Sequence, residues 1–343
     1  MKTKILSTLG PSSLNKDIVN QLAENGVDLF RINLSHTSLE DVEEVIRRVQ
    51  SWTDVPICLD SEGAQVRNQN MISESVYFKV GDLVTIHHEA ILGDSNNISF
   101  APKNVSKQFK VDDLIRIDFN SAAIRVVEDK KNYLVANVEQ GGHVGSNKAA
   151  DVNRKIDLHP ITSKDESAFR IGLDLGIEDF SLSFTNTADD VKKVREIIGS
   201  DNNLISKIES IEGVQNLADI LPLVDQILID RGDLSRQVPI EKIPFIQRGI
   251  ITFSRSMETP VFVATNLLES MIKSSVPTRA EANDVASTLL MGASGLVLAA
   301  ETAIGAYPVG AVKMINSIIK EYNQWSPDSS LNDIIYGAGN ADS

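Results

Sequence analysis

The chain has almost no cysteine, few aromatic residues and no long apolar stretch. Its one cysteine, Cys58, cannot form an internal disulfide, and its place in the apolar run VPICLD predicts a buried thiol on a strand. No stretch approaches the length that spans a bilayer, and the N-terminus MKTKILSTLG has no apolar signal region or cleavage signal. These absences predict a cytoplasmic protein without a membrane anchor.

Positive charge is also scarce. The 33 Lys and Arg residues stand against 47 Asp and Glu residues, so the formal net charge is −14. Such an excess of negative charge argues against nucleic acid or an anionic membrane as a partner. Any phosphorylated substrate must therefore be held by a local basic pocket. The length of 343 residues gives ample chain for a core and allows more than one domain.

Apolar runs without a helical period alternate with amphipathic segments along most of the chain. Because such runs are typical of strands buried on both faces, and eight of them alternate with helices, we expect a (β/α)8 TIM barrel. The expected strands are KILSTLG, VDLFRINLS, VPICLD, DFSLSF, NLISKIE, QILID, PVFVAT and GLVLAAE. An open doubly wound sheet is the alternative, but no glycine-rich turn with dinucleotide-binding spacing follows the first strand.

The helical period disappears between about Glu62 and Asn153. Short β-rich runs separated by turns replace it, which indicates a small all-β barrel inserted after the third strand. We therefore expect three parts, the last of them a polar tail. They are a catalytic barrel over 1–61 and 154–330, an inserted β-barrel lid domain over 62–153, and a tail over 331–343.

Polar residues gather where the expected strands end, which is where barrels carry their active sites. Lys207 and Glu209 end the fifth strand, and Asp233 follows the sixth. Two carboxylates suit Mg²⁺ or Mn²⁺, and a lysine suits an anion. Ordinary strand-end ion pairs are the alternative for one motif alone, but the pattern recurs on several strands. The other candidates are Gly10, Pro11, Arg31, Asn33, Ser35, His36, Asp60, Ser61, Arg67, Arg231, Gly232, Thr265 and Glu301.

These candidates divide by chemistry. Arginine and lysine side chains supply positive charge for a phosphoryl group, and the residues concerned are Arg31, Arg67 and Lys207. Oxygen donors that would suit a monovalent cation, or equally a structural hydrogen-bond cluster, are Asn33, Ser35, Asp60 and Ser61. His36 fits a structural donor as well as a catalytic group. Thr265 fits a cap for the following segment NLLESMI as well as a site residue.

At this point the residues resemble the pyruvate kinase family. The resemblance runs from Thr3 to about Tyr322 and includes the inserted β module. The segments that carry it, in order, are STLGPSS, RINLSH, LDSEGAQVR, LISKIESIEGV, RGDL, VATNLLESMI, PTRAEANDVA and ETAIGAYP. The resemblance implies a glycolytic, Mg²⁺-dependent conversion of phosphoenolpyruvate and ADP to pyruvate and ATP.

The resemblance also implies a role for individual residues. Lys207 and Arg31 would act on the transferring phosphoryl group, and Thr265 would lie near the enolate and take part in its protonation. Mg²⁺ (or Mn²⁺) would be held by Glu209 and Asp233. The expected K⁺ ligands are Asn33, Ser35, Asp60 and Ser61. The expected acid-substrate site comprises Arg31, Lys207, Gly232, Asp233 and Thr265, and the expected nucleotide site comprises Pro11, His36, Arg67 and Lys148.

The chain departs from the family pattern in four places. It stops where the family's C-terminal domain would begin, so we expect hyperbolic kinetics insensitive to sugar phosphates, and at most a homodimer through the barrel. Glu62 stands where lysine is usual, and Ala64 and Gln65 replace proline and glutamate. The segment 118–120 reads DFN instead of two aspartates and a glycine. Ala299 and Ala300 replace serine and glycine before Glu301, which removes a hydroxyl linked to proton relay.

Three functions remain open at this point. The first is the kinase reaction. The second is another metal-dependent enzyme of the same barrel superfamily, acting on a different 2-oxo acid or enol phosphate. The third is a non-catalytic relative that binds a metabolite or a protein. The inserted module favours a kinase because a kinase needs a lid over its nucleotide. The charged cluster of Lys207, Glu209 and Asp233 disfavours a non-catalytic relative.

Overall fold

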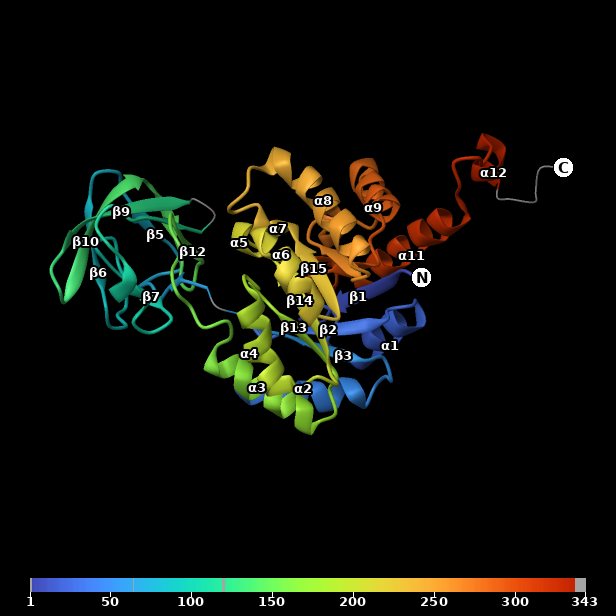
Figure 1. Cartoon of the computed structure of the whole chain (residues 1–343), viewed down its shortest axis with the longest axis horizontal. Coiled ribbons are helices and arrows are strands. Elements are labelled where there is room, and N and C mark those ends of the chain that lie inside the picture. Colours follow the sequence, from blue (N-terminus) through green and yellow to red (C-terminus); the bar gives the residue numbers. More distant parts are fainter. Residues whose placement is uncertain (1, 64, 119–120, 337–343) are drawn as a thin grey trace. The chain divides into compact units, whose positions relative to one another are not determined.

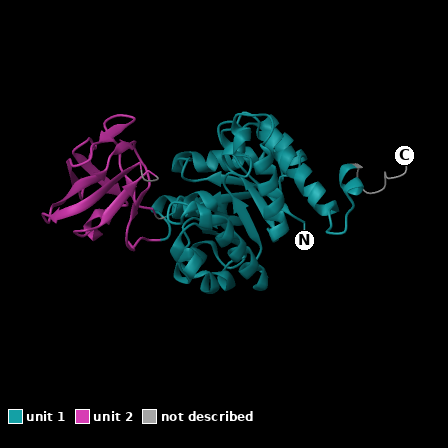
Figure 2. Cartoon of the chain, turned by 90° about the horizontal axis from the view of Figure 1, so that it is seen from above, with its two compact units in different colours: residues 1–63, 160–343 teal, residues 64–159 magenta. Residues whose placement is uncertain are grey.

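The computed structural model describes residues 2–63, 65–118 and 121–336. The chain divides into two compact units (Figure 2), one formed by residues 1–63 and 160–343 and the other by residues 64–159. The substitutions noted at Ala64, Phe119 and Asn120 lie outside the described residues, as does the end of the tail from residue 337.

The first unit contains a closed barrel of eight parallel strands, as the sequence predicted. Their order around the barrel is β1-β17-β16-β15-β14-β13-β3-β2. The strands are β1 (Lys4–Thr8), β2 (Leu29–Asn33), β3 (Ile57–Asp60), β13 (Asp179–Leu182), β14 (Asn203–Ile208), β15 (Gln226–Asp230), β16 (Val261–Ala264) and β17 (Gly295–Leu298).

Helices cover the outside of this barrel (Figure 1). Several begin with threonine caps; Thr162, Thr187 and Thr278 each form a capping box with the acidic residue three positions on. The longer helices are α1 (Lys16–Glu24), α2 (Leu39–Gln50), α3 (Ser163–Asp174), α4 (Ala188–Ile198), α8 (Ile243–Ser256), α9 (Arg279–Met291) and α11 (Pro308–Gln324). The shorter ones are α5 (Ile211–Gln215), α6 (Leu217–Ile220), α7 (Arg231–Leu234), α10 (Ala300–Ala303) and α12 (Leu331–Tyr336). None of the described helices is long and apolar enough to cross a membrane.

The barrel has two apolar cores, one on each side of its wall. The outer core lies between strands and helices and includes Phe30, Phe180 and Ile227. The inner core fills the barrel and is formed by Leu6, Leu29, Cys58, Ile205, Leu228, Phe262, Ala264 and Val297. Because the side chains of a strand alternate between its two faces, the residue two positions after each inner residue of a strand is also expected to face inward. Cys58 is buried there, as the sequence predicted.

The second unit is all β. A seven-stranded sheet has the order β12-β8-β9-β10-β6-β7-β4, and a two-stranded sheet pairs β11 with β5. Its strands are β4 (Arg67–Asn68), β5 (Val76–Phe78), β6 (Leu83–His87), β7 (Asn97–Ala101), β8 (Leu114–Ile117), β9 (Ala122–Asp129), β10 (Tyr133–Gln140), β11 (Gly142–Val144) and β12 (Ala150–Val152). An isolated bridge between Arg67 and Ala149 links the region of the two outer strands, β4 and β12. The sheet therefore curls around a core that includes Phe78, Ile86 and Ile124.

Two segments after the strands form shorter elements than their sequences predict. The helical period of GVQNLADIL predicts one helix, but α5 ends at Gln215 and α6 begins at Leu217. The segment NLLESMI forms only the 3-10 turn η4 (Glu269–Ile272), whose N-cap is Leu268. Thr265 therefore caps no helix. Its φ is +76°, an uncommon backbone conformation for a β-branched residue and one often found at functional sites.

Candidate active site

Strand alternation brings the charged residues of β14 into the barrel. Ile205 belongs to the inner core, so Lys207 and Glu209 follow on the same inward face. Both are buried, with exposed fractions of 5% and 1%. Charged groups are buried at this depth only when they are paired or bind an ion. Their partners therefore define the site.

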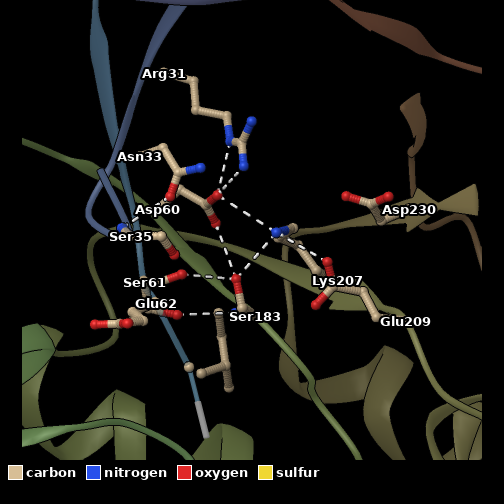
Figure 3. Close-up of polar contacts among 12 residues, drawn as sticks. Arg31, Asn33, Ser35, Asp60, Ser61, Glu62, Ser183, Lys207, Glu209 and Asp230 are labelled. Carbon is tan, nitrogen blue, oxygen red and sulfur yellow. Dashed lines mark hydrogen bonds and ion pairs between the residues drawn. The ribbon is translucent and has the colours of Figure 1, made fainter. Parts of the chain in front are cut away.

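One partner group is centred on Asp60, at the end of β3 (Figure 3). The Arg31 guanidinium donates from Nε to Asp60 Oδ2 at 2.7 Å and pairs with the same oxygen through its second nitrogen. Its third nitrogen donates to Thr8 Oγ1 at 3.0 Å. Burial would raise the pKa of Asp60, but the charges of Arg31 and Lys207 bring it below its ordinary value. Asp60 is therefore held as a compensated carboxylate.

Lys207 lies between this group and the carboxylates on the other side (Figure 3). Its Nζ is 3.4 Å from Asp60 Oδ2 and 2.9 Å from Glu209 Oε1, and it donates to Ser183 Oγ at 3.0 Å. Burial would lower the pKa of Lys207, but the charges of Asp60 and Glu209 raise it above its ordinary value. The ammonium stays charged and fixed, as the stabilisation of a developing anion requires.

Three carboxylates form an acidic cluster at the ends of β14 and β15. The cluster consists of Glu209, Asp230 and Asp233, whose carboxylate oxygens lie within 4.8 Å of one another. Glu209 Oε2 accepts a hydrogen bond from Phe184 N at 2.7 Å. Glu209 Oε1 makes the ion pair with Lys207 but accepts no hydrogen bond of good geometry, although it is buried. Hard oxygen donors this close, one of them unsatisfied, fit a divalent cation such as Mg²⁺ or Mn²⁺.

The protonation behaviour of the acidic cluster supports this fit. Burial raises the pKa of Glu209 to about 8. The charge of Lys207 lowers this pKa, but the negative charges of Asp233 and Asp230 offset part of that lowering. Burial also raises the pKa of Asp233, and the charge of Asp230 adds to the rise. A dication would relieve this repulsion because it favours the ionised form of all three groups.

Thr265 is held beside the acidic cluster from two sides. Its hydroxyl donates to Asp230 Oδ1 at 2.5 Å. Its carbonyl oxygen accepts hydrogen bonds from Arg231 Nε at 3.1 Å and from a second Arg231 nitrogen at 2.5 Å. Position 232 requires glycine, because a Cβ there would lie 2.8 Å from the Thr265 methyl carbon. Of the acid-substrate residues named from the resemblance, Lys207, Gly232, Asp233 and Thr265 thus lie on the adjacent strands β14, β15 and β16 or just after them, whereas Arg31 lies on β2.

The four expected K⁺ ligands also come together (Figure 3), but side-chain oxygens of Asn33, Asp60 and Ser61 already accept hydrogen bonds. Asn33 Oδ1 accepts from Ser35 N at 3.0 Å, and Ser61 Oγ accepts from Ser183 N at 2.9 Å. One reason to expect K⁺ here would be that the Asp60 carboxylate needs a counter-charge, but Arg31 and Lys207 already supply it. The second acidic residue nearby, Glu62, lies 3.8 Å from the Lys164 ammonium.

The expected nucleotide residues fall into two groups. Pro11 and His36 are exposed residues of the barrel unit, and the His36 amide donates to Asn33 O at 3.1 Å. Arg67 and Lys148 belong to the second unit. There Arg67 donates to Asn147 O at 3.0 Å, and Lys148 Nζ is 3.5 Å from Asp118. Their nucleotide contacts remain predictions. Glu301, the candidate of the eighth strand, is buried and accepts from the amides of Leu268 and Ala299.

Sequence reasoning missed two residues of the site. Asp230 follows Leu228 by two positions on β15, so strand alternation could have placed it inside the barrel with the other carboxylates. Ser183 lies just beyond β13 and joins the two sides of the site. Its hydroxyl donates to Ser61 O at 2.7 Å and accepts from Lys207. A serine after a strand has no sequence signal that distinguishes it from an ordinary loop serine.

Comparison with known proteins agrees with this geometry. The family model described as pyruvate kinase, barrel domain, matches residues 1–312. A pyruvate kinase of Thermotoga maritima is 33% identical over 328 residues, which cover 93% of this chain and 70% of that protein. One of Mycobacterium tuberculosis is 33% identical over 325 residues, covering 92% and 69%. One of Agrobacterium vitis is 34% identical over 327 residues, covering 93% and 68%. The chain therefore belongs to the pyruvate kinase family and is a phosphotransferase.

Proposed function

We propose that the protein transfers the phosphoryl group of phosphoenolpyruvate to ADP, forming pyruvate and ATP, and that the reaction depends on Mg²⁺ or Mn²⁺. The observation that carries this proposal is the buried Lys207 ammonium. It lies between the acidic cluster and the pair of Arg31 with Asp60. Phosphoryl transfer requires a fixed positive charge next to a group of carboxylates that can bind a divalent cation.

The residues divide the work by charge. Lys207 and Arg31 would neutralise the oxygens of the transferring phosphoryl group, since both cations face the barrel interior beside Asp60. Glu209, Asp233 and Asp230 would hold the divalent cation, which when bound supplies charge neutralisation to substrate oxygens. The Thr265 hydroxyl, beside that cluster, would lie next to the enol carbon that takes up a proton.

The test is a pyruvate-forming assay with phosphoenolpyruvate, Mg²⁺ and a panel of nucleoside diphosphates. We expect turnover with at least one diphosphate, strongest with ADP, and loss of turnover when a chelator removes the metal. Lys207→Met serves as the inactive control, since it removes the ammonium while keeping an unbranched side chain only one atom shorter. The proposal would be overturned if the wild-type protein binds Mn²⁺ but forms no pyruvate with any diphosphate.

A further inference from the structure

We infer that Asp230 is a positioning residue that orients the Thr265 hydroxyl and, as the third carboxylate of the acidic cluster, ties that orientation to the divalent cation. This inference rests on the proposed function. It adds a residue that neither the expected metal ligands nor the expected catalytic residues included.

The position of Asp230 follows from the register of β15. Its neighbour Leu228 packs in the inner core, so Asp230 projects into the barrel, where it pairs in register with Ala264 of β16. The Asp230 carboxylate lies near both Thr265 and the other two carboxylates of the acidic cluster. Oδ1 accepts from Thr265 Oγ1 at 2.5 Å and from Gly232 N at 3.1 Å. The carboxylate also has an oxygen within 4.8 Å of ligand atoms of Glu209 and Asp233.

The hydrogen bond to Asp230 fixes which side of Thr265 faces the site. A hydroxyl has one proton, and in this structure that proton points at the carboxylate. The oxygen lone pairs of Thr265 are then the part left for other partners. The following residue, Arg231, holds the Thr265 carbonyl and is itself anchored to Asp284 at 2.7 Å. Asp230 and Arg231 thus bind the same residue, one at its hydroxyl and the other at its carbonyl.

These hydrogen bonds account for the positive φ of Thr265. A threonine at φ +76° is strained, and such a conformation persists only where its surroundings over-determine it. The hydroxyl bond to Asp230 and the carbonyl bonds to Arg231 supply that determination. The neighbouring Gly232 leaves room for the Thr265 methyl group, which a side chain would displace. The position of the Thr265 hydroxyl is therefore fixed by its backbone conformation, by the space at Gly232 and by the hydrogen bonds of Asp230 and Arg231.

The charge of Asp230 reaches both sides of the site. On the cation side, an oxygen of Asp230 lies within 4.8 Å of ligand atoms of Glu209 and Asp233, and on the other side the carboxylate accepts from the Thr265 hydroxyl. Its removal would therefore weaken cation binding as well as release Thr265. These two effects can be separated, because asparagine keeps an oxygen that accepts from Thr265 but has no charge, whereas alanine has neither.

The experiment measures Mn²⁺ affinity by electron paramagnetic resonance and the exchange of pyruvate methyl protons with D₂O by NMR. We expect Asp230→Asn to weaken Mn²⁺ binding about tenfold to a hundredfold, yet to exchange protons near the wild-type rate once Mn²⁺ is saturating. Asp230→Ala should weaken Mn²⁺ binding similarly and, at saturating Mn²⁺, still exchange at least about tenfold more slowly. Asp219→Asn, an exposed acid on α6, is the matched control and should change neither quantity.

Each result decides the inference. Wild-type Mn²⁺ affinity and wild-type exchange in Asp230→Ala would overturn it, and so would an equal loss of exchange in both variants at saturating Mn²⁺. Thermal melting shows whether a variant is folded, and the isosteric asparagine keeps the test valid if alanine unfolds the site. Failure of the proposed function gives a different pattern, in which wild-type protein binds Mn²⁺ through Asp230 but forms no pyruvate from phosphoenolpyruvate.

Discussion

Asp60 and Glu209 are two carboxylates buried in one barrel to almost the same depth, 0% and 1% exposed. Their acidities move in opposite directions. The pKa of Asp60 lies below its ordinary value, whereas burial raises the pKa of Glu209 to about 8. Desolvation acts on both, so the difference comes from their neighbours. Asp60 has two cations on one oxygen, while Glu209 shares Lys207 with Asp60 and faces two further carboxylates.

This difference divides the site into two halves. We call the surroundings of Asp60 the finished half, because protein cations neutralise its charge, and the surroundings of Glu209 the unfinished half, because its carboxylates lack enough counter-charge. Around Asp60 the protein supplies its own counter-charges, so no ion is needed to neutralise that carboxylate. Around Glu209 it supplies too few, and the shortfall suits a dication. Lys207 is the only cation of the described residues that the structure pairs with both Asp60 and Glu209. The following predictions test the division by removing one contributor at a time.

The largest effect should come from Lys207→Met. Removal of the shared ammonium leaves both halves with less positive charge and deprives the phosphoryl group of a fixed cation. We expect turnover to fall by about three orders of magnitude, with a much smaller change in KM for phosphoenolpyruvate. Steady-state kinetics of pyruvate formation measure both. Lys193→Met, an exposed lysine on α4, is the control. A loss confined to KM would show that Lys207 acts in ground-state binding instead.

The second prediction concerns the unfinished half. Asp233→Asn removes one negative charge from the acidic cluster, and we expect Mn²⁺ affinity to fall about tenfold to a hundredfold, with turnover falling at fixed metal concentration. Titration calorimetry with Mn²⁺ measures the affinity directly. Asp174→Asn, an exposed aspartate in the last turn of α3, is the matched control. Unchanged affinity and turnover in Asp233→Asn would show that the cation binds elsewhere.

The pH dependence of metal binding should follow Glu209. Its pKa is about 8 in the folded protein and near 4.5 when unperturbed, so between these values folding takes up a proton. Glu209 therefore stabilises the metal-free fold below about pH 4.5, and this contribution is lost as the pH rises through 8. Mg²⁺ must displace that proton below pH 8 but not above it.

We accordingly expect Mg²⁺ to raise the unfolding temperature by several degrees more at about pH 8.5 than at about pH 6. Differential scanning calorimetry with and without Mg²⁺ measures the shift. In Glu209→Gln, which has no proton to displace, the shift should be small and the same at both values. An equal Mg²⁺ shift at both pH values in the wild-type protein would contradict the assignment of Glu209 as a ligand.

How far the sequence could predict this site depends on the kind of contact. Strand ends and strand alternation are local, so the barrel and the inward direction of Lys207 and Glu209 could be predicted from runs such as NLISKIE. The same rule reaches Asp230 through Leu228. Pairing between strands is not local. Nothing in the letters shows that Arg31 reaches Asp60 at 2.7 Å, or that Ser183 joins Ser61 to Lys207. The compensation of Asp60 therefore had to come from the structure.

The smallest effect should come from a monovalent cation in the finished half. The oxygens of Asn33, Ser35, Asp60 and Ser61 lie together there, and each oxygen that already accepts a hydrogen bond has a further lone pair. A cation bound among them would therefore add coordination, although Arg31 and Lys207 already neutralise Asp60. We expect K⁺ to stimulate turnover only a few-fold, worth less than about 1 kcal/mol, and to do so better than Na⁺.

The measurement compares turnover in K⁺, Na⁺ and tetramethylammonium buffers at equal ionic strength. Ser35→Ala should reduce the K⁺ response, because no other described contact engages the Ser35 hydroxyl, whereas Ser51→Ala on the exposed end of α2 should leave it unchanged. Equal turnover in K⁺ and tetramethylammonium would show that the finished half binds no stimulating cation. A loss of about a hundredfold or more without K⁺ would contradict the division itself, because a carboxylate neutralised by Arg31 and Lys207 would then still depend on a mobile ion.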